Sequence, residues 1–571
     1  MDNAEIARLL AEITDLLEIR GENVFKVRAY QKAARAVENL AESLAELHKR
    51  GELKSIDGIG KGMAEKIQEA LDTGKIAYHE ELLASLPAGL LELLNVSGMG
   101  PKKTKLVYET LGIASIDQLQ KAAEAGQLQS LPGMGKKTEE KILKGIANLR
   151  QSAGRFHLGA AYAVAEDIVN RLRQIDGVQR VEFAGSLRRG KETVGDVDIL
   201  AAAENSEAAM QEFLATKNRR DILAQGETKL SIVLHSGLQV DLRSVPLLSF
   251  GAALQYFTGS KEHNVKLREL AVRQGIKINE YGVFDAKTEE RLGGENEEDI
   301  YQALGLPIIV PELREGFDEI ELAREGKLPP LIEAQDIQSA IHNHTVWSDG
   351  RMTLDELVEE AKRRGYRFIA VTDHSGSLGV ANGLNPDRLQ RQIEEIHRWN
   401  ETHKGFRILT GSEVDIRADG SLDFPDDLLE QLDVVIAAIH SSFEQPRDKM
   451  TQRICSAIEN PNIDILAHPT GRMIGQRPPL DIDLERLFST AAASRTALEI
   501  NAHYYRLDLN DKHIREAKTH GVKFTLDTDT HSKADFDNLK FGLQTARRGR
   551  LEAGDVLNTL PLKAFLKAIA K

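Results

Sequence analysis

Short apolar runs that end at histidine or carboxylate residues fill the last two-fifths of the chain and limit its fold more than any other feature. Amphipathic helical patterns separate these runs. The runs are Ala340-Ile341, Phe368–Val371, Ile408-Leu409, Val434–Ile439, Ile463–Leu466, Ala497–Ile500 and Phe524–Leu526. Alternating strands and helices with polar groups at the carboxyl ends of the strands are typical of a barrel whose active face collects those groups. We therefore predict a distorted (β/α)7 barrel over residues 336–571.

The polar residues at these strand ends have the chemistry of metal ligands. Eleven of the 16 histidines follow residue 340. Imidazoles mixed with carboxylates suit Zn2+, Mn2+ or Fe2+ better than Mg2+ alone. The candidate ligands are His342, His344, Asp349, His374, Glu413, His440, His468, Asp529 and His531.

A second acidic cluster is predicted near the middle of the chain. The apolar residues from Val197 to Leu200 indicate a strand, whose two-residue period puts Asp196 and Asp198 on one face. A further apolar run follows the Ser236-Gly237 turn and brings Asp241 back toward them. Three neighbouring carboxylates repel one another unless cations neutralise their charge. Two Mg2+ ions that bridge phosphate oxygens would neutralise it. This pattern favours a phosphoryl-transfer site.

A glycine-bracketed turn precedes the acidic strand. It contains Ser186 and Arg189, and its glycines would let backbone amides approach phosphate oxygens while the arginine clamps them. The segment 185–200 resembles the nucleotidyltransferase signature of the family X DNA polymerases, the group that contains DNA polymerase beta. The resemblance implies that Asp196, Asp198 and Asp241 are catalytic and hold two Mg2+ (or Mn2+) ions, and that Ser186, Arg189 and Gly195 contact the triphosphate of the incoming nucleotide.

The resemblance continues beyond the acidic strands. It implies that Tyr256 and Phe257, next to Gly259, exclude ribonucleotides, and that Asn264 and Arg268 lie along the nascent base pair with Arg243 behind the aspartates. Lys261 departs from the acidic residue of the animal enzymes.

Three Gly-x-Gly hairpins, each opening a helix, occur in the helical first 150 residues: Gly58 with Gly60, Gly98 with Gly100, and Gly133 with Gly135. The helix dipole disfavours lysines in a first turn, so Lys102, Lys103, Lys136 and Lys137 are expected to bind an anion. The hairpins resemble helix-hairpin-helix clamps on the DNA backbone. The alternative is a set of ordinary helix-capping turns.

Lys66 falls on the position of the Schiff-base lysine with which family members remove a 5′-deoxyribose phosphate. Lys26 and Tyr30 fall on supporting positions that contact DNA. Phe25 and Gly62 depart from the family's histidine and lysine. Whether this domain is a lyase stays open.

The nine residues at the barrel's strand ends resemble the ligand set of the PHP (polymerase and histidinol phosphatase) domain. That resemblance implies a phosphoesterase with up to three Zn2+, Mn2+ or Fe2+ ions, in which a metal-bound water attacks phosphorus. Exonuclease, abasic-site endonuclease and phosphatase substrates all stay open.

A chain of 571 residues is too long for one core. We expect a multidomain α/β protein: a helical lyase-like domain (1–85), helix-hairpin-helix fingers (86–150), a mixed α+β nucleotidyltransferase palm (151–245) and thumb (246–315), a linker (316–335) and the PHP barrel (336–571). The net charge of −14 argues, taken alone, against nucleic-acid binding, although basic residues can gather locally. The single cysteine and the lack of long apolar segments predict a cytoplasmic monomer without membrane contact.

Together these features predict a family X DNA polymerase that fills short gaps during DNA repair and carries a metal-dependent 3′-5′ exonuclease or phosphoesterase. Its partners would be gapped or primed duplex DNA and deoxynucleoside triphosphates. Two alternatives are a PHP nuclease or phosphatase whose polymerase half only binds DNA, and a non-catalytic scaffold for DNA ends.

Overall fold

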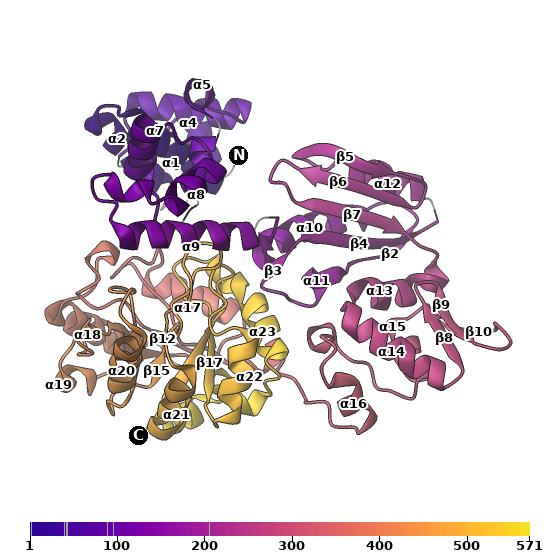
Figure 1. The fold of residues 1–571 in the computed structure, drawn as a ribbon. Coiled ribbons are helices and arrows are strands. Elements are labelled where there is room, and N and C mark those ends of the chain that lie inside the picture. The colour runs from indigo at the N-terminus through magenta and orange to yellow at the C-terminus, as the bar shows by residue number, and fades with distance from the viewer. Residues whose placement is uncertain are drawn as a thin grey trace. The chain divides into compact units, whose positions relative to one another are not determined.

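The computed structural model describes residues 1, 3–38, 40, 44–56, 58–87, 89–94, 96, 98–152, 154–204 and 206–570. The chain divides into two compact units (Figure 1). One contains residues 1–153 with 475–477, and the other contains residues 154–474 and 478–571.

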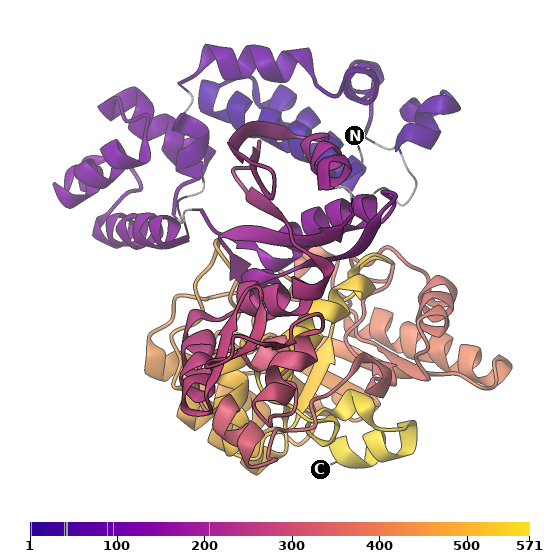
Figure 2. The same cartoon turned by 90° about the vertical axis from the view of Figure 1, so that its right-hand side faces the viewer.

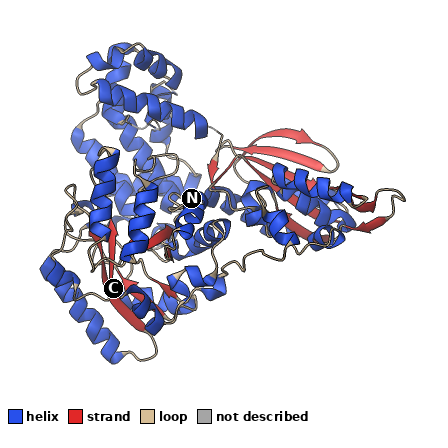
Figure 3. Ribbon diagram, turned by 60° about the horizontal axis from the view of Figure 1, so that its bottom comes forward, coloured by secondary structure: helices blue, strands red, loops and turns tan. Residues whose placement is uncertain are grey.

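The first unit is helical throughout its described part of residues 1–152 (Figure 3). Its first core joins α1, α2, α4 and α5, because residues such as Ile6, Leu10 and Ile13 recur on one helix face and are buried. A second core lies under α6 to α9. The helices are α1 (Asn3–Arg20), α2 (Val24–Glu38), α3 (Leu44–Lys49), α4 (Lys61–Thr73), α5 (Ala77–Ser85), α6 (Gly89–Leu94), α7 (Pro101–Leu111), α8 (Ile116–Glu124) and α9 (Lys136–Ser152).

The palm is a five-stranded sheet in the order β2-β4-β7-β6-β5, in which only β4 and β7 pair in parallel. Val197, Ile199 and Ala201 point from β4 into the core beneath α10 and α12, so the alternate residues of β4 face the opposite side. The elements are β1 (Phe156–His157), α10 (Leu158–Leu172), β2 (Val178–Phe183), α11 (Gly185–Arg188), β3 (Thr193–Val194), β4 (Asp196–Ala203), α12 (Ser206–Leu214), β5 (Arg219–Gln225), β6 (Lys229–Leu234) and β7 (Gln239–Ser244).

The thumb packs helices on a small antiparallel sheet. Its elements are α13 (Phe250–Thr258), α14 (Lys261–Arg273), β8 (Ile276–Asn279), β9 (Gly282–Asp285), β10 (Arg291–Gly293), α15 (Glu297–Ala303) and α16 (Glu319–Arg324). The expected linker over 316–335 needs correction, because α16 lies within it and buries Ile320 and Ala323 in the thumb core. Its Glu319 accepts a 2.7 Å hydrogen bond from the buried His263. The charged residues that suggested a linker are thus partly internal.

A buried ion-pair network ties the palm to the thumb. The guanidinium of Arg188 bonds both oxygens of Glu297, at 2.8 and 2.7 Å, and Arg314, fully buried, bonds the same carboxylate. Burial would raise the pKa of Glu297, but Arg314 and Arg188 lower it to about 2. The carboxylate therefore stays ionised at all ordinary pH values.

Replacing Glu297 by glutamine should weaken the thumb strongly, because a buried arginine loses its counterion. We expect a loss of about 3–5 kcal/mol in local stability near pH 7, measured as hydrogen exchange of the α15 amides. A carboxylate with a lowered pKa stabilises the fold above its unfolded pKa, so the difference from wild type should shrink as the pH falls from about 4 to about 2. The exposed Glu298→Gln variant is the matched control and should exchange like wild type.

The barrel has seven parallel strands in sequence order, β11 to β17. A parallel bridge between Asn343 and Thr530 brings its two edges together. Its strands are β11 (Ser339–Ala340), β12 (Phe368–Val371), β13 (Arg407–Asp415), β14 (Val434–Ala438), β15 (Ile465–Leu466), β16 (Ala497–Asn501) and β17 (Phe524–Asp527), and its helices are α17 (Leu354–Arg363), α18 (Pro386–Thr402), α19 (Asp426–Leu429), α20 (Arg447–Ile458), α21 (Leu484–Ser494), α22 (Asp511–Thr519), α23 (Leu539–Arg548) and α24 (Leu562–Ile569). The predicted fold class is confirmed.

Two aromatic contacts inside the second unit stabilise the barrel and join it to the palm. The last helix, α24, beside the C mark in Figure 2, packs Phe565 against Phe368 at a ring-centroid distance of 5.5 Å. Phe541 of α23 lies in the same apolar cluster as the palm residues of α10, with its ring 5.5 Å from that of Tyr162. Helices of the described residues are too short or too polar to cross a bilayer.

Candidate active sites

Three carboxylates meet on the palm sheet. The parallel register of β4 and β7 puts Asp198 opposite Asp241, and Asp196 lies two residues earlier on the same face. Asp241 is buried and its oxygens are 3.1 Å from Lys229 Nζ and 2.9 Å from Gln239 Nε2. Neither Lys229 nor Gln239 was anticipated from the sequence, since each resembles an ordinary strand residue.

The electrostatics of this cluster suit a divalent cation. Burial, Asp196 and Asp241 raise the pKa of Asp198 to about 6, and burial with Asp241 also raises the pKa of Asp196. Asp196 and Asp198, whose pKa values are raised beside Asp241, would gain from a bound cation, because it removes the repulsion among the neighbouring carboxylates. The residues present therefore fit Mg2+ or Mn2+.

The turn before β4 is built around glycine. Gly185 has a φ of +64°, and a Cβ there would lie 2.8 Å from Asp198 Oδ2. Ser186 lies in α11, and a Cβ at Gly195 would meet no atom of the described residues within 4 Å. Arg189 is held by the thumb: its guanidinium donates to the Thr258 carbonyl, and its Nε is 3.2 Å from Glu315 Oε1.

The predicted nucleotide residues of the thumb form one connected group at the junction of α13 and α14. The rings of Tyr256 and Phe257 meet edge to face at 5.1 Å, and the Arg243 guanidinium lies 4.5 Å above the Phe257 ring. Asn264 donates to the Tyr256 carbonyl at 2.7 Å, and Arg268 Nε donates to the Asn264 carbonyl at 3.2 Å. Gly259, at φ +67°, ends α13.

The three glycine hairpins share one geometry. Gly58, Gly98 and Gly133 have φ values of +88°, +94° and +74°, which explains the glycine at each first position. Gly60, Gly100 and Gly135 immediately precede α4, α7 and α9, and a Cβ at any of them would meet no described atom within 4 Å. These open helix starts can approach a phosphate.

The lysines that follow the second and third hairpins differ in their contacts and exposure. Lys103 Nζ donates to the Gly98 carbonyl at 2.9 Å and so helps to close its own hairpin. Lys102 is exposed, as are Lys136 and Lys137. The three exposed lysines are the ones available to an anion.

Lys66 and Lys26 converge on Tyr78, which the sequence analysis did not single out. Their ammonium groups lie 4.6 and 4.8 Å from the Tyr78 ring centroid, and Lys26 Nζ donates to its hydroxyl at 2.6 Å. Tyr30 is buried and stacks on the same ring at 6.1 Å. No motif marks Tyr78 in the sequence.

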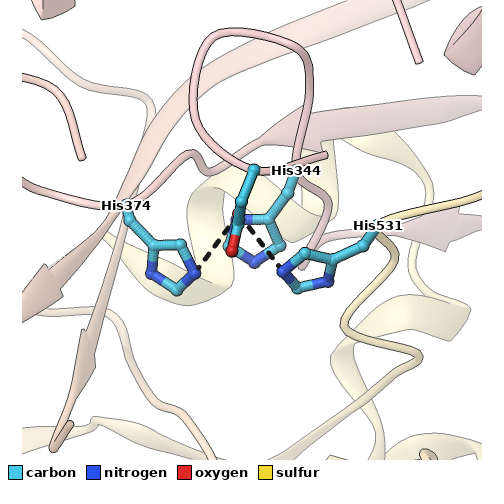
Figure 4. A group of neighbouring side chains, drawn as sticks. His344, His374 and His531 are labelled. Atoms are coloured by element: carbon cyan, nitrogen blue, oxygen red, sulfur yellow. Dashed lines mark ion pairs between the residues drawn. The ribbon is translucent and has the colours of Figure 1, made fainter. Parts of the chain in front are cut away.

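The carboxyl ends of the barrel strands bring all nine predicted metal ligands together. Three groups have ligand atoms within 4.8 Å of one another: His344, Asp349, His374 and His531; His342, His344 and Asp529; and His374, Glu413 and His440. Figure 4 shows His344, His374 and His531 turned toward one another. His468 adjoins the third group, 3.0 Å from Glu413 Oε1.

Glu413 is the common partner of this centre. Its oxygens lie between 2.8 and 3.6 Å from nitrogens of His342, His344, His374, His440 and His468. Burial would raise its pKa, but His374, His440 and His342 lower it well below the ordinary value. Burial, His531 and His374 lower the pKa of His344 to about 3, which leaves a neutral imidazole suited to bind a metal.

Buried polar atoms without hydrogen-bond partners support the fit to metal ions. Among the described residues, both ring nitrogens of His344, Nε2 of His342 and Oε2 of Glu413 are buried and lack a hydrogen-bond partner. Buried polar atoms are almost always satisfied, so several in one cluster point to ions as the missing partners. The donor set of imidazoles and carboxylates matches transition metals.

Five family models match successive parts of the chain. They are a helix-hairpin-helix domain (1–76), a SAM-like helix-hairpin-helix tandem (90–148), DNA polymerase beta palm (160–242), DNA polymerase beta thumb (253–315) and PHP domain (340–503). The chain is 41% identical to the DNA polymerase/3′-5′ exonuclease PolX of Bacillus subtilis (strain 168), over 99% of this chain and 100% of that protein. The chain belongs to the PolX family.

Other relatives of this PolX-family chain are shorter proteins. A probable phosphatase of Thermoanaerobacter sp. (strain X514) is 30% identical over 40% of the chain and 93% of its own length. A probable phosphatase of Caldicellulosiruptor saccharolyticus is 32% identical over 34% of the chain and 80% of its own length. The predicted family is confirmed by the full-length match.

Two carboxylates that contact candidate metal ligands of this PolX-family chain were missed by the sequence analysis. Glu499 Oε1 is 2.6 Å from His342 Nδ1, and Asp415 Oδ1 is 2.8 Å from His440 Nδ1. Such partners orient a ligating imidazole and fix its tautomer. Glu499 lies within the predicted strand Ala497–Ile500, and Asp415 lies two positions after the candidate ligand Glu413. These positions were their only signal in the sequence. Arg506 lines a cavity together with the candidate ligands His374, Glu413 and His440, and its buried Nη1 has no hydrogen-bond partner among the described residues.

Proposed function

We propose that this chain fills short gaps in duplex DNA during repair, and that its PHP domain hydrolyses 3′-terminal phosphodiesters or phosphates. The observation that carries the proposal is the presence, in one chain, of two separate clusters with different cation chemistry. Carboxylates alone gather on the palm, and imidazoles with carboxylates gather at the barrel. The first suits Mg2+-assisted phosphoryl transfer and the second suits metal-assisted hydrolysis.

At the palm, Asp196, Asp198 and Asp241 would hold two Mg2+ or Mn2+ ions, which stabilise the charge that develops on the phosphate. The primer 3′-hydroxyl would lose its proton beside Asp241 and attack the α-phosphorus in line, and pyrophosphate would leave. Ser186 and Arg189 would hold the triphosphate, and Phe257 would exclude a ribose 2′-hydroxyl. The glycine at position 185 leaves room for Asp198 beside the turn.

At the barrel, the nine ligands would hold up to three Zn2+, Mn2+ or Fe2+ ions, which polarise the phosphoryl group and activate water. Glu499 and Asp415 would keep His342 and His440 oriented. The three hairpins would bind the DNA backbone on either side of a gap without reading its sequence. The protein would act as a monomer.

A gapped-duplex assay with two variants tests the assignment. Asp196→Ala should stop nucleotide addition and leave shortening of 3′ ends unchanged, whereas His440→Ala should do the reverse, because the clusters are chemically independent. Primer extension and 3′-end shortening are measured on the same labelled duplex with Mn2+. A polymerase half that only binds DNA would leave every activity of Asp196→Ala intact, and a scaffold would show neither activity in wild type.

The convergence of Lys66 and Lys26 on Tyr78 favours a second activity, removal of a 5′-deoxyribose phosphate. We expect borohydride to trap wild-type protein on an incised abasic site, and we expect Lys66→Ala to abolish the trapping because the Schiff-base amine is lost. Lys75→Ala, which changes an exposed lysine just beyond the end of the same helix, is the control. Equal trapping by wild type and Lys66→Ala would contradict the role of Lys66.

A further inference from the structure

Helix α23 of the barrel touches the phosphate-binding turn of the palm directly. Gly190 closes that turn with a φ of +65°, and a Cβ there would lie 2.8 Å from Gln544 Cβ. Any side chain at position 190 would therefore collide with Gln544 of α23. A movement of α23 would move the turn.

Arg548, at the end of α23, forms a second and more directional contact with the turn. One of its nitrogens, Nη1, donates both to the Arg189 carbonyl at 2.9 Å and to Glu315 Oε1 at 2.8 Å. The other, Nη2, donates to Asp511 Oδ2 at 2.8 Å, which anchors the guanidinium to α22 of the barrel. The side chain of Arg548 is 4% exposed, so water does not compete for these bonds.

Glu315 carries this contact to the side chain of Arg189. Its Oε1 is also 3.2 Å from Arg189 Nε, and its Oε2 is 3.5 Å from Lys191 Nζ. Burial would raise the pKa of Glu315, but Arg548, Lys191 and Arg189 lower it, so the carboxylate remains charged. Arg548 thus fixes both ends of Arg189: its carbonyl directly and its guanidinium through Glu315.

The neighbouring residue Arg547 provides a contrast within the same helix. Its Nε donates to Glu312 Oε1 at 2.8 Å and its Nη1 donates to the Ile332 carbonyl at 3.0 Å. It joins α23 to the end of the thumb and to the segment that follows it. Among the described residues, Arg547 makes no hydrogen bond or ion pair with the 185–190 turn. Of these two adjacent arginines, Arg547 only attaches α23 to neighbouring segments, whereas Arg548 contacts the turn itself.

We infer that Arg548, a residue of the PHP barrel, is a positioning residue of the polymerase site. It holds the 185–190 turn and Arg189 in the position that receives the triphosphate of the incoming nucleotide. The barrel thus supports the polymerase site without contributing a catalytic residue to it. The inference rests on the proposed polymerase function of the palm. An arginine that is not held in place binds a phosphate less tightly, so loss of this support should weaken nucleotide binding.

Steady-state gap filling by the full chain tests this role, with Arg548→Ala, Arg548→Lys and the matched control Arg547→Ala. We expect Arg548→Ala to raise the KM for deoxynucleoside triphosphate about tenfold with little change in kcat. Arg548→Lys, which can keep only part of the contact set, should lie between Arg548→Ala and wild type. Arg547→Ala should keep the wild-type KM. Calorimetric titration with dGTP and Mg2+ should show the same order of affinities without catalysis.

The outcomes separate the inference from its rivals. Shortening of 3′ ends should stay at the wild-type rate in all three variants, because the metal ligands are untouched. Equal KM values in wild type and Arg548→Ala, or equal effects of Arg547→Ala and Arg548→Ala, would overturn the positioning role. Lack of synthesis by wild type would instead refute the polymerase function itself. Should Arg548→Ala not fold, Asp511→Asn replaces it, since it releases the far end of the guanidinium and should raise KM in the same direction.

Discussion

Glu413→Gln should lower the hydrolysis of 3′ ends by about a thousandfold, equivalent to about 4 kcal/mol of transition-state stabilisation. The reason is the central position of this carboxylate, which lies within 3.6 Å of five imidazoles. A neutral amide at this position would be a weaker metal ligand and would not balance the charge of bound cations. Elemental analysis of the purified protein should show fewer transition-metal ions per chain than in wild type.

The control is Glu485→Gln, which changes an exposed glutamate of the same barrel. It should keep the wild-type metal content and hydrolysis, and both variants should fill gaps at the wild-type rate. Full metal content in Glu413→Gln would contradict the assignment of this carboxylate as a ligand.

Asp198→Asn should stop gap filling almost completely and, at the same time, make the metal-free protein more stable. A carboxylate whose folded pKa is raised to about 6 costs stability above that pH and nothing below its unfolded pKa of about 4. Two pH units correspond to about 2–3 kcal/mol, so the variant should resist urea better than wild type at pH 7.5 in EDTA. The advantage should disappear near pH 4.

Added Mg2+ provides the second half of this test. It should stabilise wild type at pH 7.5, because the ions relieve the repulsion among Asp196, Asp198 and Asp241, and it should stabilise Asp198→Asn less. The exposed Asp221→Asn variant of the palm edge should behave like wild type throughout. Equal stability of Asp198→Asn and wild type in EDTA at pH 7.5 would show that the three carboxylates are not crowded.

The features that could be predicted from the sequence are those that depend on a pattern of neighbouring residues in the chain. The alternation along 196–203 put two aspartates on one face, and the apolar runs of the barrel ended at the candidate ligands. Strand periodicity and strand ends are both read from neighbouring residues. The stretch 316–335 defeated the same approach: its charged residues suggested a solvated linker, yet Glu319 is buried against His263. Burial of that carboxylate depends on a partner 56 residues away, which no local pattern reveals.

The supporting residues of both sites were hidden for the same reason. Glu499 and Asp415 resemble other strand carboxylates until the fold turns them toward His342 and His440. Tyr78 and Lys229 carry no motif, and their importance comes only from what lies beside them. A candidate ligand can be recognised from its residue type and its spacing in the sequence. The groups that orient it depend on packing between segments that are distant in the sequence.

The packing of α23 against the palm has a consequence for how the protein is made. Every residue to which we assign chemistry at either site precedes residue 532, yet Phe541 contributes to the apolar cluster of the palm and Arg548 holds its turn. A ribosome that has already synthesised both sets of ion-binding residues would still carry a palm with one side uncovered. A premature stop codon between 532 and 539 would therefore spare both sets of ion-binding residues, yet remove side chains that complete the palm cluster and the barrel core.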